Sequence, residues 1–312
     1  MPTAGIPMVD ISEFPREREF VQRLGEGYAA YGFCGVIGHG IEAQVIDEAY
    51  AAVRAFFALP TAVKKQYVMD NGGARGYTPL GVETAKGSRY PDLKEFWQVG
   101  REIAGPTACH RAYYDNVWPS EVEQFRPCLY RLFEQLEALA VRILSALALY
   151  LNLPADYFAE KVNLGNSVLR ALHYPGITEP ATRSLRAAPH EDINLITLLV
   201  GSNSSGLEIL THDGEWIPVQ SAADTIVVNI GDMMQRLTNH KLPSTTHRVV
   251  NTPQAYDGDS RYSIPFFCHP NPDFLIESLP SCVGPGHPNR YPKPITADDY
   301  LRQRLVEIGL LS

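Results

Sequence analysis

The spacing of apolar residues changes character about halfway along the chain. Apolar positions recur at helical spacing over residues 15–30, 41–57 and 119–150, which predicts helices. Pro127 lies inside the last of these segments and predicts a kink or a division there. From residue 167 the period becomes two, in short runs separated by Gly, Asn, Asp or Pro, which predicts strands. These runs cover 167–174, 193–200, 206–210, 216–219, 225–230, 247–251 and 261–268.

The β-rich region is flanked by other elements. Ahead of the long helix we expect an extended segment at 6–11, a strand within GFCGVIGHG, a glycine-rich loop over 71–88 and a strand near 93–99. After the last strand, the proline-rich segment 270–294 predicts irregular structure, and 296–308 predicts a closing helix with Thr296 as its N-cap. Many short strands favour a sandwich or barrel. The expected fold class is therefore mainly β with flanking helices.

We expect one compact unit made of two regions. Residues 1–118 would form an N-terminal lobe of helices and strands, and residues 119–312 a β domain with its backing helix and C-terminal helix. The chain has 312 residues and is 45% apolar, which is enough for a sizeable core.

Charge and cysteine content exclude several classes of protein. A formal net charge of −8 argues against binding to nucleic acid, because phosphates require clustered Lys and Arg. The five cysteines are scattered without a C-x-x-C pair, which favours reduced thiols. The N-terminus has no signal-peptide pattern, and no apolar run indicates a membrane segment. We expect a cytoplasmic protein that is a monomer or a weak dimer.

A candidate metal site is formed by His190, Asp192 and His247. His190 and Asp192 are two residues apart at the mouth of a strand, so their side chains should point to the same face. His247 follows 55 residues after Asp192 in STTHRVVN and would supply a third ligand from a distant strand. Two imidazoles and a carboxylate are typical of Fe(II) oxygenases, because they leave coordination positions open. An isolated H-x-D, however, more often marks a turn or a hydrogen-bonded pair.

A second pair strengthens the metal hypothesis. Arg261 and Ser263 in RYSIPFF are again two apart on a strand that follows His247. An arginine can hold a carboxylate by two parallel hydrogen bonds, and a serine on the same face can add a third. The order H-x-D, distant His, then R-x-S therefore predicts a metal beside a binding site for an organic acid.

These motifs together resemble the isopenicillin N synthase-like family of Fe(II)/2-oxoglutarate dioxygenases. The resemblance covers most of the chain and rests on segments in the family's order: IPMVDIS, YGFCGVIGHGI, RGYTPLGVE, DLKEFWQVG, LHYP, HEDINLITLL, GLEIL, GEWIPV, IVVNIGDMMQRLTNHKLPSTTHRVVN and RYSIPFF. It implies a double-stranded β-helix (jelly-roll) core. It also implies that His190, Asp192 and His247 bind iron, while Arg261, Ser263 and Tyr174 bind 2-oxoglutarate. Leu172 stands where many members have Asn, which removes one expected co-substrate contact.

The resemblance implies an oxidoreductase that uses Fe(II), 2-oxoglutarate and O₂, with ascorbate as a candidate reductant. Such an enzyme would couple decarboxylation of 2-oxoglutarate to hydroxylation, desaturation or cyclisation of a small molecule.

Several functions are compatible with the sequence alone. The string HEDINLITLL is closest to isopenicillin N synthase, an oxidase that uses no 2-oxoglutarate, although the terminus EIGLLS lacks the Gln-Thr expected of that enzyme. An ethylene-forming enzyme, a protein hydroxylase and a non-catalytic barrel that binds a small molecule are further possibilities. We favour 2-oxoglutarate chemistry.

Strand alternation suggests which residues face the substrate. If Tyr174 points inward, so does Arg170; Phe267 follows Arg261 and Ser263, and Asn194 follows Asp192. Arg170 would either pair with a core carboxylate or bind an acidic substrate. Tyr77, beside Arg75 in the glycine-flanked RGYTP, would either close over the site as a lid or lie in a surface turn. His173 should face away from the metal.

Overall fold

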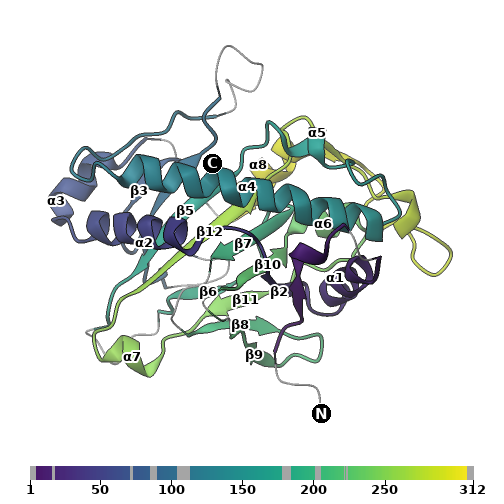
Figure 1. Ribbon diagram of the computed structural model, residues 1–312, viewed down its shortest axis with the longest axis horizontal. Coiled ribbons are helices and arrows are strands. Elements are labelled where there is room, and N and C mark those ends of the chain that lie inside the picture. Colours follow the sequence, from purple (N-terminus) through teal and green to yellow (C-terminus); the bar gives the residue numbers. More distant parts are fainter. Residues whose placement is uncertain are drawn as a thin grey trace.

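The computed structural model describes residues 5–15, 18–70, 73–84, 90–103, 113–177, 184–200, 205–220, 222 and 224–307. Two β-sheets form its centre, and a long helix, α4 (Phe125–Tyr150), runs across one of them (Figure 1). Helices α1 (Arg18–Tyr31) and α2 (Ala43–Phe57) pack against α4. Parts of the glycine-rich loop 71–88 and the last residue of the expected 296–308 helix lie outside the described residues.

The major sheet contains strands from both halves of the sequence. Its order is β1 (Met8–Asp10), β2 (Phe33–Ile37), β10 (Ile226–Ile230), β7 (Ile196–Val200), β12 (Arg261–Cys268), β5 (Val168–Tyr174), β4 (Glu95–Gly100) and β3 (Gly76–Thr78). The minor sheet has the order β6 (Ala187–His190), β11 (His247–Val249), β8 (Leu207–Leu210) and β9 (Trp216–Pro218). Because β1 to β4 lie in the same sheet as the later strands, the N-terminal region completes the β core. The division at residue 118 stays a prediction.

The two sheets enclose a jelly-roll core, and the expected fold class is confirmed. Residues of the major sheet alternate between two environments. Ile264 and Phe266 of β12 belong to the apolar core under α4, where Phe266 meets the ring of Phe133 at a centroid distance of 5.1 Å. Arg261 and Ser263 of the same strand line a pocket on the opposite face. The sheet thus separates a packed helical side from a polar interior.

Helix α4 begins later than the periodicity suggests. Pro127 was expected to kink or divide it, but the helix starts at Phe125, so Pro127 occupies its first turn. The amide nitrogens of a first turn have no carbonyl partner within the helix, and proline costs little there. The expectation of a kink at Pro127 is therefore wrong.

Short elements connect the larger ones. Helix α6 (Asp232–Leu237) follows β10, and a single helical turn, α7 (Pro253–Tyr256), lies in the segment between β11 and β12. The C-terminal helix α8 (Ala297–Glu307) begins as expected, because the hydroxyl of Thr296 accepts a hydrogen bond from the amide of Asp299 at 3.2 Å. The remaining short elements are η1 (Ile11–Glu13), α3 (Thr61–Lys64), η2 (Lys65–Tyr67), α5 (Ala159–Val162), β13 (Leu275–Ile276), η4 (Pro280–Cys282) and β14 (Ile295–Thr296).

Candidate active site

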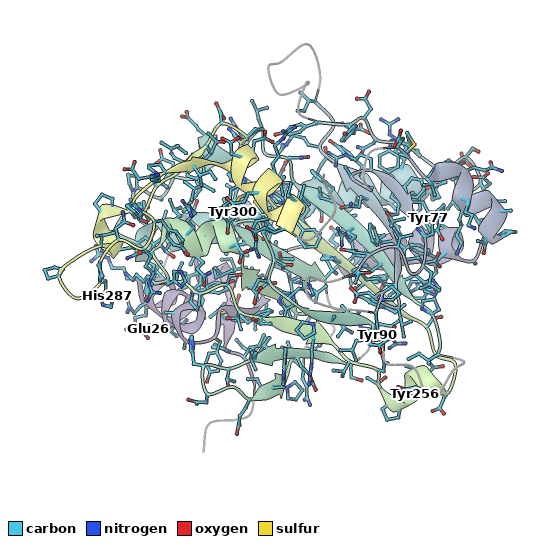
Figure 2. All side chains as sticks on the ribbon, turned by 180° about the vertical axis from the view of Figure 1, so that it is seen from behind. Glu26, Tyr77, Tyr90, Tyr256, His287 and Tyr300 are labelled. Carbon is cyan, nitrogen blue, oxygen red and sulfur yellow. The ribbon has the colours of Figure 1, made fainter. Side chains whose placement is uncertain are left out.

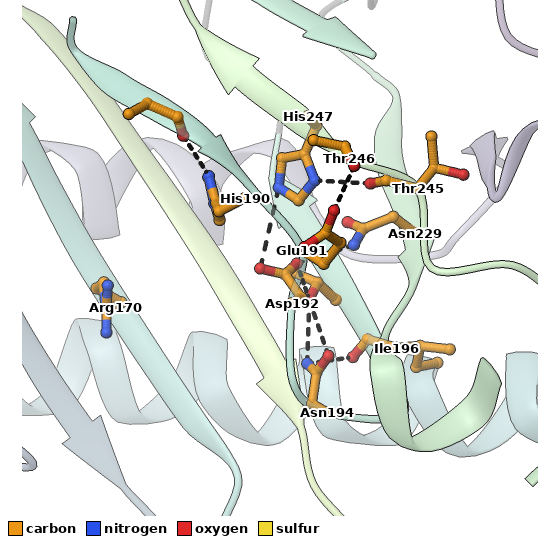
Figure 3. Close-up of polar contacts among 12 residues, drawn as sticks. Arg170, His190, Glu191, Asp192, Asn194, Ile196, Asn229, Thr245, Thr246 and His247 are labelled. Carbon is orange, nitrogen blue, oxygen red and sulfur yellow. Dashed lines mark hydrogen bonds and ion pairs between the residues drawn. The ribbon is translucent and has the colours of Figure 1, made fainter. Parts of the chain in front are cut away.

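His190, Asp192 and His247 come together at one end of the minor sheet. His190 ends β6 and His247 begins β11, and the two residues are direct partners across this antiparallel pair. Asp192 lies in the loop after β6. One ligand atom from each of the three side chains lies within 4.8 Å of the others, and Figure 3 shows the three side chains gathered around one point. Among the described residues this is the one such cluster of His, Cys, Asp and Glu that could hold a metal ion.

The backbone orients both imidazoles. Nδ1 of His190 lies 2.8 Å from the carbonyl oxygen of Ala188, and Nδ1 of His247 lies 3.1 Å from that of Thr245. A carbonyl only accepts, so each Nδ1 carries the hydrogen, and each Nε2 presents a lone pair. This is the tautomer that binds a metal through Nε2.

Asp192 is held through one carboxylate oxygen. Its Oδ2 accepts hydrogen bonds from the Thr197 hydroxyl at 2.6 Å and the Asn229 amide at 2.8 Å. Its Oδ1 lies 3.9 Å from Nε2 of His247. One oxygen is therefore hydrogen-bonded to the protein, and the other faces the imidazole of His247.

The charge states of the cluster suit a cation. Burial acts to raise the pKa of Asp192, but the imidazoles of His247 and His190 and the two hydrogen bonds outweigh it and lower that pKa. Burial and the neighbouring His247 lower the pKa of His190 to about 4. An ionised carboxylate thus lies beside a neutral imidazole, as metal coordination requires.

An unpaired guanidinium lies in the same pocket. Arg261 is buried, its Nε has no hydrogen-bond partner, and it forms no ion pair with a carboxylate among the described residues. Its guanidinium lies 4.9 Å from the centre of the Tyr174 ring and donates to the hydroxyl of Ser263 at 3.3 Å. Arg186 is close enough that burial and the charge of Arg261 lower its pKa. A buried cation without a counter-ion favours the binding of an anion.

Known proteins are similar to this chain in sequence and in fold. Residues 6–121 match the family described as non-haem dioxygenase in morphine synthesis, N-terminal, and residues 165–270 match the 2OG-Fe(II) oxygenase superfamily. A 2-oxoglutarate-Fe(II) type oxidoreductase, hxnY, of Emericella nidulans is 33% identical to this chain, over 96% of the chain and 89% of the relative. This chain belongs to the 2OG-Fe(II) oxygenase superfamily.

Solved structures of superfamily members superpose on nearly the whole chain. A 2OG-Fe(II) oxygenase family protein from Caulobacter crescentus is 46% identical, with a TM-score of 0.92, and covers 98% of this chain and 100% of its own. A full-length Neurospora crassa protein in complex with alpha-KG, which is 2-oxoglutarate, is 30% identical with a TM-score of 0.86, over 98% of each chain. The chain is therefore an Fe(II)/2-oxoglutarate-dependent dioxygenase, and the expected use of Fe(II), 2-oxoglutarate and O₂ is confirmed.

Two residues expected to face the substrate do not. Asn194 is fully buried, and its amide donates to Thr197 Oγ1 and to the carbonyl of Ile196, both at 3.0 Å. The strand was expected to run from residue 193, but β7 begins at Ile196, so alternation cannot be counted through the loop from Asp192. Asn194 supports the hydroxyl that holds Asp192 instead of lining the pocket.

Tyr77 is neither a lid nor a surface residue. It is 2% exposed in β3, and its hydroxyl donates to Glu95. Figure 2 shows Tyr77 beside the N-terminal helices, where β3 forms the edge of the major sheet. Its ring meets that of Phe56 at 5.9 Å, so Tyr77 belongs to the core.

Arg170, Phe267 and Leu172 line the pocket, as strand alternation predicts. Arg170 pairs with the carboxylate of Glu83, at 3.2 Å from one oxygen. His173 faces the other way, toward Glu95 and Ser260.

Sequence reasoning missed three residues that hold a predicted ligand or line the pocket. Thr197 and Asn229 secure Asp192, and Lys94 lines the pocket beside Arg170. Thr197 and Asn229 lie on strands whose type was predicted, so alternation within β7 and β10 could have marked both as inward-facing, whereas Lys94 lies just before β4. Their partner could not be known without the sheet register.

No helix among the described residues is long and apolar enough to cross a membrane.

Proposed function

We propose that His190, Asp192 and His247 bind Fe(II), and that Arg261, Ser263 and Tyr174 bind the carboxylate of 2-oxoglutarate that is remote from its keto acid. The observation that carries the proposal is that His190, Asp192 and His247 each have one polar atom hydrogen-bonded to the protein and another left free. The free Nε2 of His247 lies 3.9 Å from the free Oδ1 of Asp192, and one ligand atom of each of the three side chains lies within 4.8 Å of the others. Three protein ligands leave further positions for the keto acid and O₂.

When bound, the iron supplies the oxidising chemistry, in which 2-oxoglutarate is decarboxylated to succinate and CO₂ while a substrate C–H bond is oxidised. The chain supplies position. Arg261 fixes the far end of the co-substrate by charge-assisted hydrogen bonds, and the carbonyls of Ala188 and Thr245 prevent the imidazoles from rotating.

The substrate would occupy the part of the pocket beside Arg170 and Phe267. Both side chains line the same pocket as the ligand group and come from strands adjacent in the major sheet. The expected monomer or weak dimer and the cytoplasmic location stay predictions.

Anaerobic addition of Fe(II) and 2-oxoglutarate should produce a visible metal-to-ligand charge-transfer band. Admission of O₂, with ascorbate present, should release succinate and CO₂ even without the true substrate. Absence of both the band and succinate would contradict the proposal. Substrate oxidation without succinate would instead indicate an oxidase of the isopenicillin N synthase type.

A further inference from the structure

A partly buried group of four charged side chains lies beside the candidate metal centre. Lys94 and Arg170 line the same pocket as His190 and Asp192. Nζ of Lys94 lies 2.9 Å from Asp92 and 3.4 Å from Glu83, and Nη1 of Arg170 lies 3.2 Å from Glu83. Figure 3 shows Arg170 apart from the ligand side chains.

The cations of this group face the pocket, and the carboxylates lie behind them. Lys94 and Arg170 belong to the pocket lining, whereas Glu83 and Asp92 do not. Burial acts to raise the pKa of Glu83, but Lys94 and Arg170 outweigh it and hold the pKa at about 2, so this carboxylate is ionised. Arg261 is assigned to the co-substrate and Asp192 to the metal. Lys94 and Arg170 are then the pocket cations that remain to face a substrate.

Neither cation has its hydrogen-bonding capacity filled. The Nε of Arg170 is buried without a partner, and its Nη atoms lie 3.2 to 3.5 Å from Glu83 and Gln98. These contacts are longer than the roughly 2.7–2.9 Å of a strong charge-assisted hydrogen bond. Lys94 contacts two carboxylates among the described residues, and an ammonium has three donors. Donors therefore remain for a ligand.

Apolar surface surrounds the same cations. The guanidinium of Arg170 lies 4.2 Å from the centre of the Phe96 ring and 5.4 Å from that of Phe267. Phe267, Leu172 and Pro265 line the same pocket as this guanidinium and the co-substrate anchors. A ligand that suits this region has an anionic end and an apolar body.

We propose that the substrate is a small organic acid whose carboxylate is bound by Arg170 and Lys94 and whose apolar part lies over Phe267. The inference rests on the proposed function, because it takes the metal and 2-oxoglutarate positions as given. A cationic substrate would be repelled by the two side chains that face the pocket, and a neutral one would offer their remaining donors no anionic acceptor besides Glu83 and Asp92.

Matched acids and amides test the proposal. The probes are 3-phenylpropanoate with 3-phenylpropanamide, and hexanoate with hexanamide, each added to the anaerobic Fe(II) and 2-oxoglutarate complex. Displacement of water near the metal perturbs the charge-transfer band, so a titration of the band gives an apparent Kd. We expect the apparent Kd of each acid to be lower than that of its amide by about tenfold or more, which is the discrimination typical of a hydrogen bond to a charged group.

Three variants assign the effect to this group. Arg170→Met should abolish the preference for the acid over its amide. Glu83→Gln removes the competing internal anion and should tighten acid binding without changing amide binding. Arg248→Met is the matched control, because Arg248 also pairs with a glutamate, Glu208, and lies 3.9 Å from an aromatic ring, but on the minor sheet. It should behave as the wild type.

The failures of the two proposals are distinguishable. Absence of the charge-transfer band when the wild type receives Fe(II) and 2-oxoglutarate without any acid or amide would overturn the proposed function. A normal band combined with equal effects of acid and amide, with no effect of any acid, or with a preference that survives Arg170→Met would overturn the acid-binding site alone. If Arg170→Met does not fold, the charge-balanced double variant Glu83→Gln with Arg170→Met replaces it.

Discussion

At the scale of single residues, the candidate metal centre depends on how each ligand is restrained. A free histidine side chain can rotate and present either ring nitrogen. In this protein the carbonyls of Ala188 and Thr245 select Nε2 of His190 and His247 before any metal binds. The site is thereby preorganised for a cation.

Replacement of His247 by alanine should eliminate metal binding in this form. The variant has one imidazole and one carboxylate left, so we expect no charge-transfer band with Fe(II) and 2-oxoglutarate, and no succinate formation. His212→Ala, at an exposed histidine, is the control and should change neither. A full band in His247→Ala would refute the ligand assignment.

Arg261→Gln should weaken the binding of 2-oxoglutarate. Glutamine keeps hydrogen-bonding ability but loses the charge, so we expect Kd to rise about tenfold or more, as for other hydrogen bonds to charged groups. The Kd of Arg261→Lys should lie between those of the wild type and Arg261→Gln, because a lysine keeps the charge but cannot form the bidentate pair. The measurement is titration of the charge-transfer band with 2-oxoglutarate. An unchanged Kd in Arg261→Gln would contradict the anchor assignment.

At the scale of elements, a loop determines which side chains reach the metal. Residues after His190 leave β6 of the minor sheet, and the chain enters β7 of the major sheet at Ile196. This loop approaches Gly231 so closely that an added Cβ would lie 2.3 Å from the carbonyl oxygen of Asn194. Gly231 is needed because any side chain would collide with this loop, and not because its φ is unusual. The approach lets the loop present Asp192 inward while Asn194 is buried beneath it.

A buried ion pair joins the N-terminal helices to the major sheet. Nζ of Lys64 lies 2.9 Å from both carboxylate oxygens of Glu95 in β4. Tyr77 donates to the same carboxylate, and His173 lies within hydrogen-bond distance of it. The pair thus fixes the end of α3 against three strands.

Lys64→Met should destabilise the fold by roughly 3 kcal/mol, because it leaves a buried carboxylate without its counter-ion. The neighbouring Lys65 is exposed, and Lys65→Met should change stability by less than about 0.5 kcal/mol. Urea unfolding monitored by fluorescence provides both values. Equal stabilities of the two variants would show that the pair contributes nothing to the fold.

At the scale of the whole molecule, the major sheet has opposite functions on its two faces. One face packs under α4 with apolar side chains, and the other carries the polar residues of the pocket. Stability and chemistry therefore depend on different residues of the same strands. Substitutions under α4 should affect folding more than binding.

Phe133→Ala tests this separation. Phe133 is buried in α4 against Phe266, so its truncation should cost about 3–5 kcal/mol of stability. The folded fraction should still bind Fe(II) and 2-oxoglutarate with the wild-type Kd. Leu149→Ala, at an exposed position of the same helix, should have little effect on either quantity. A large change in Kd with little loss of stability would contradict the separation.

The elements could be predicted from the sequence because their patterns are local. Apolar spacing within 41–57 and alternation within 261–268 depend on residues close in the chain, and both segments form the expected helix and strand. The candidate ligands could be named for a related reason, since the order of H-x-D, distant His and R-x-S is a property of the chain itself. Arg170 and Phe267 were placed in the pocket by alternation within single strands.

What the tertiary structure alone decided depends on contacts between distant segments. Tyr77 is buried because β3 pairs with β4 under the N-terminal helices, and Asn194 is buried outside the pocket because the loop after Asp192 resets the alternation. Arg170 and its partner Glu83 are 87 residues apart in the chain. They meet only because β4, which follows Glu83, pairs with β5, which contains Arg170. Local periodicity contains no information on such pairings, because they are selected by the packing of the whole core.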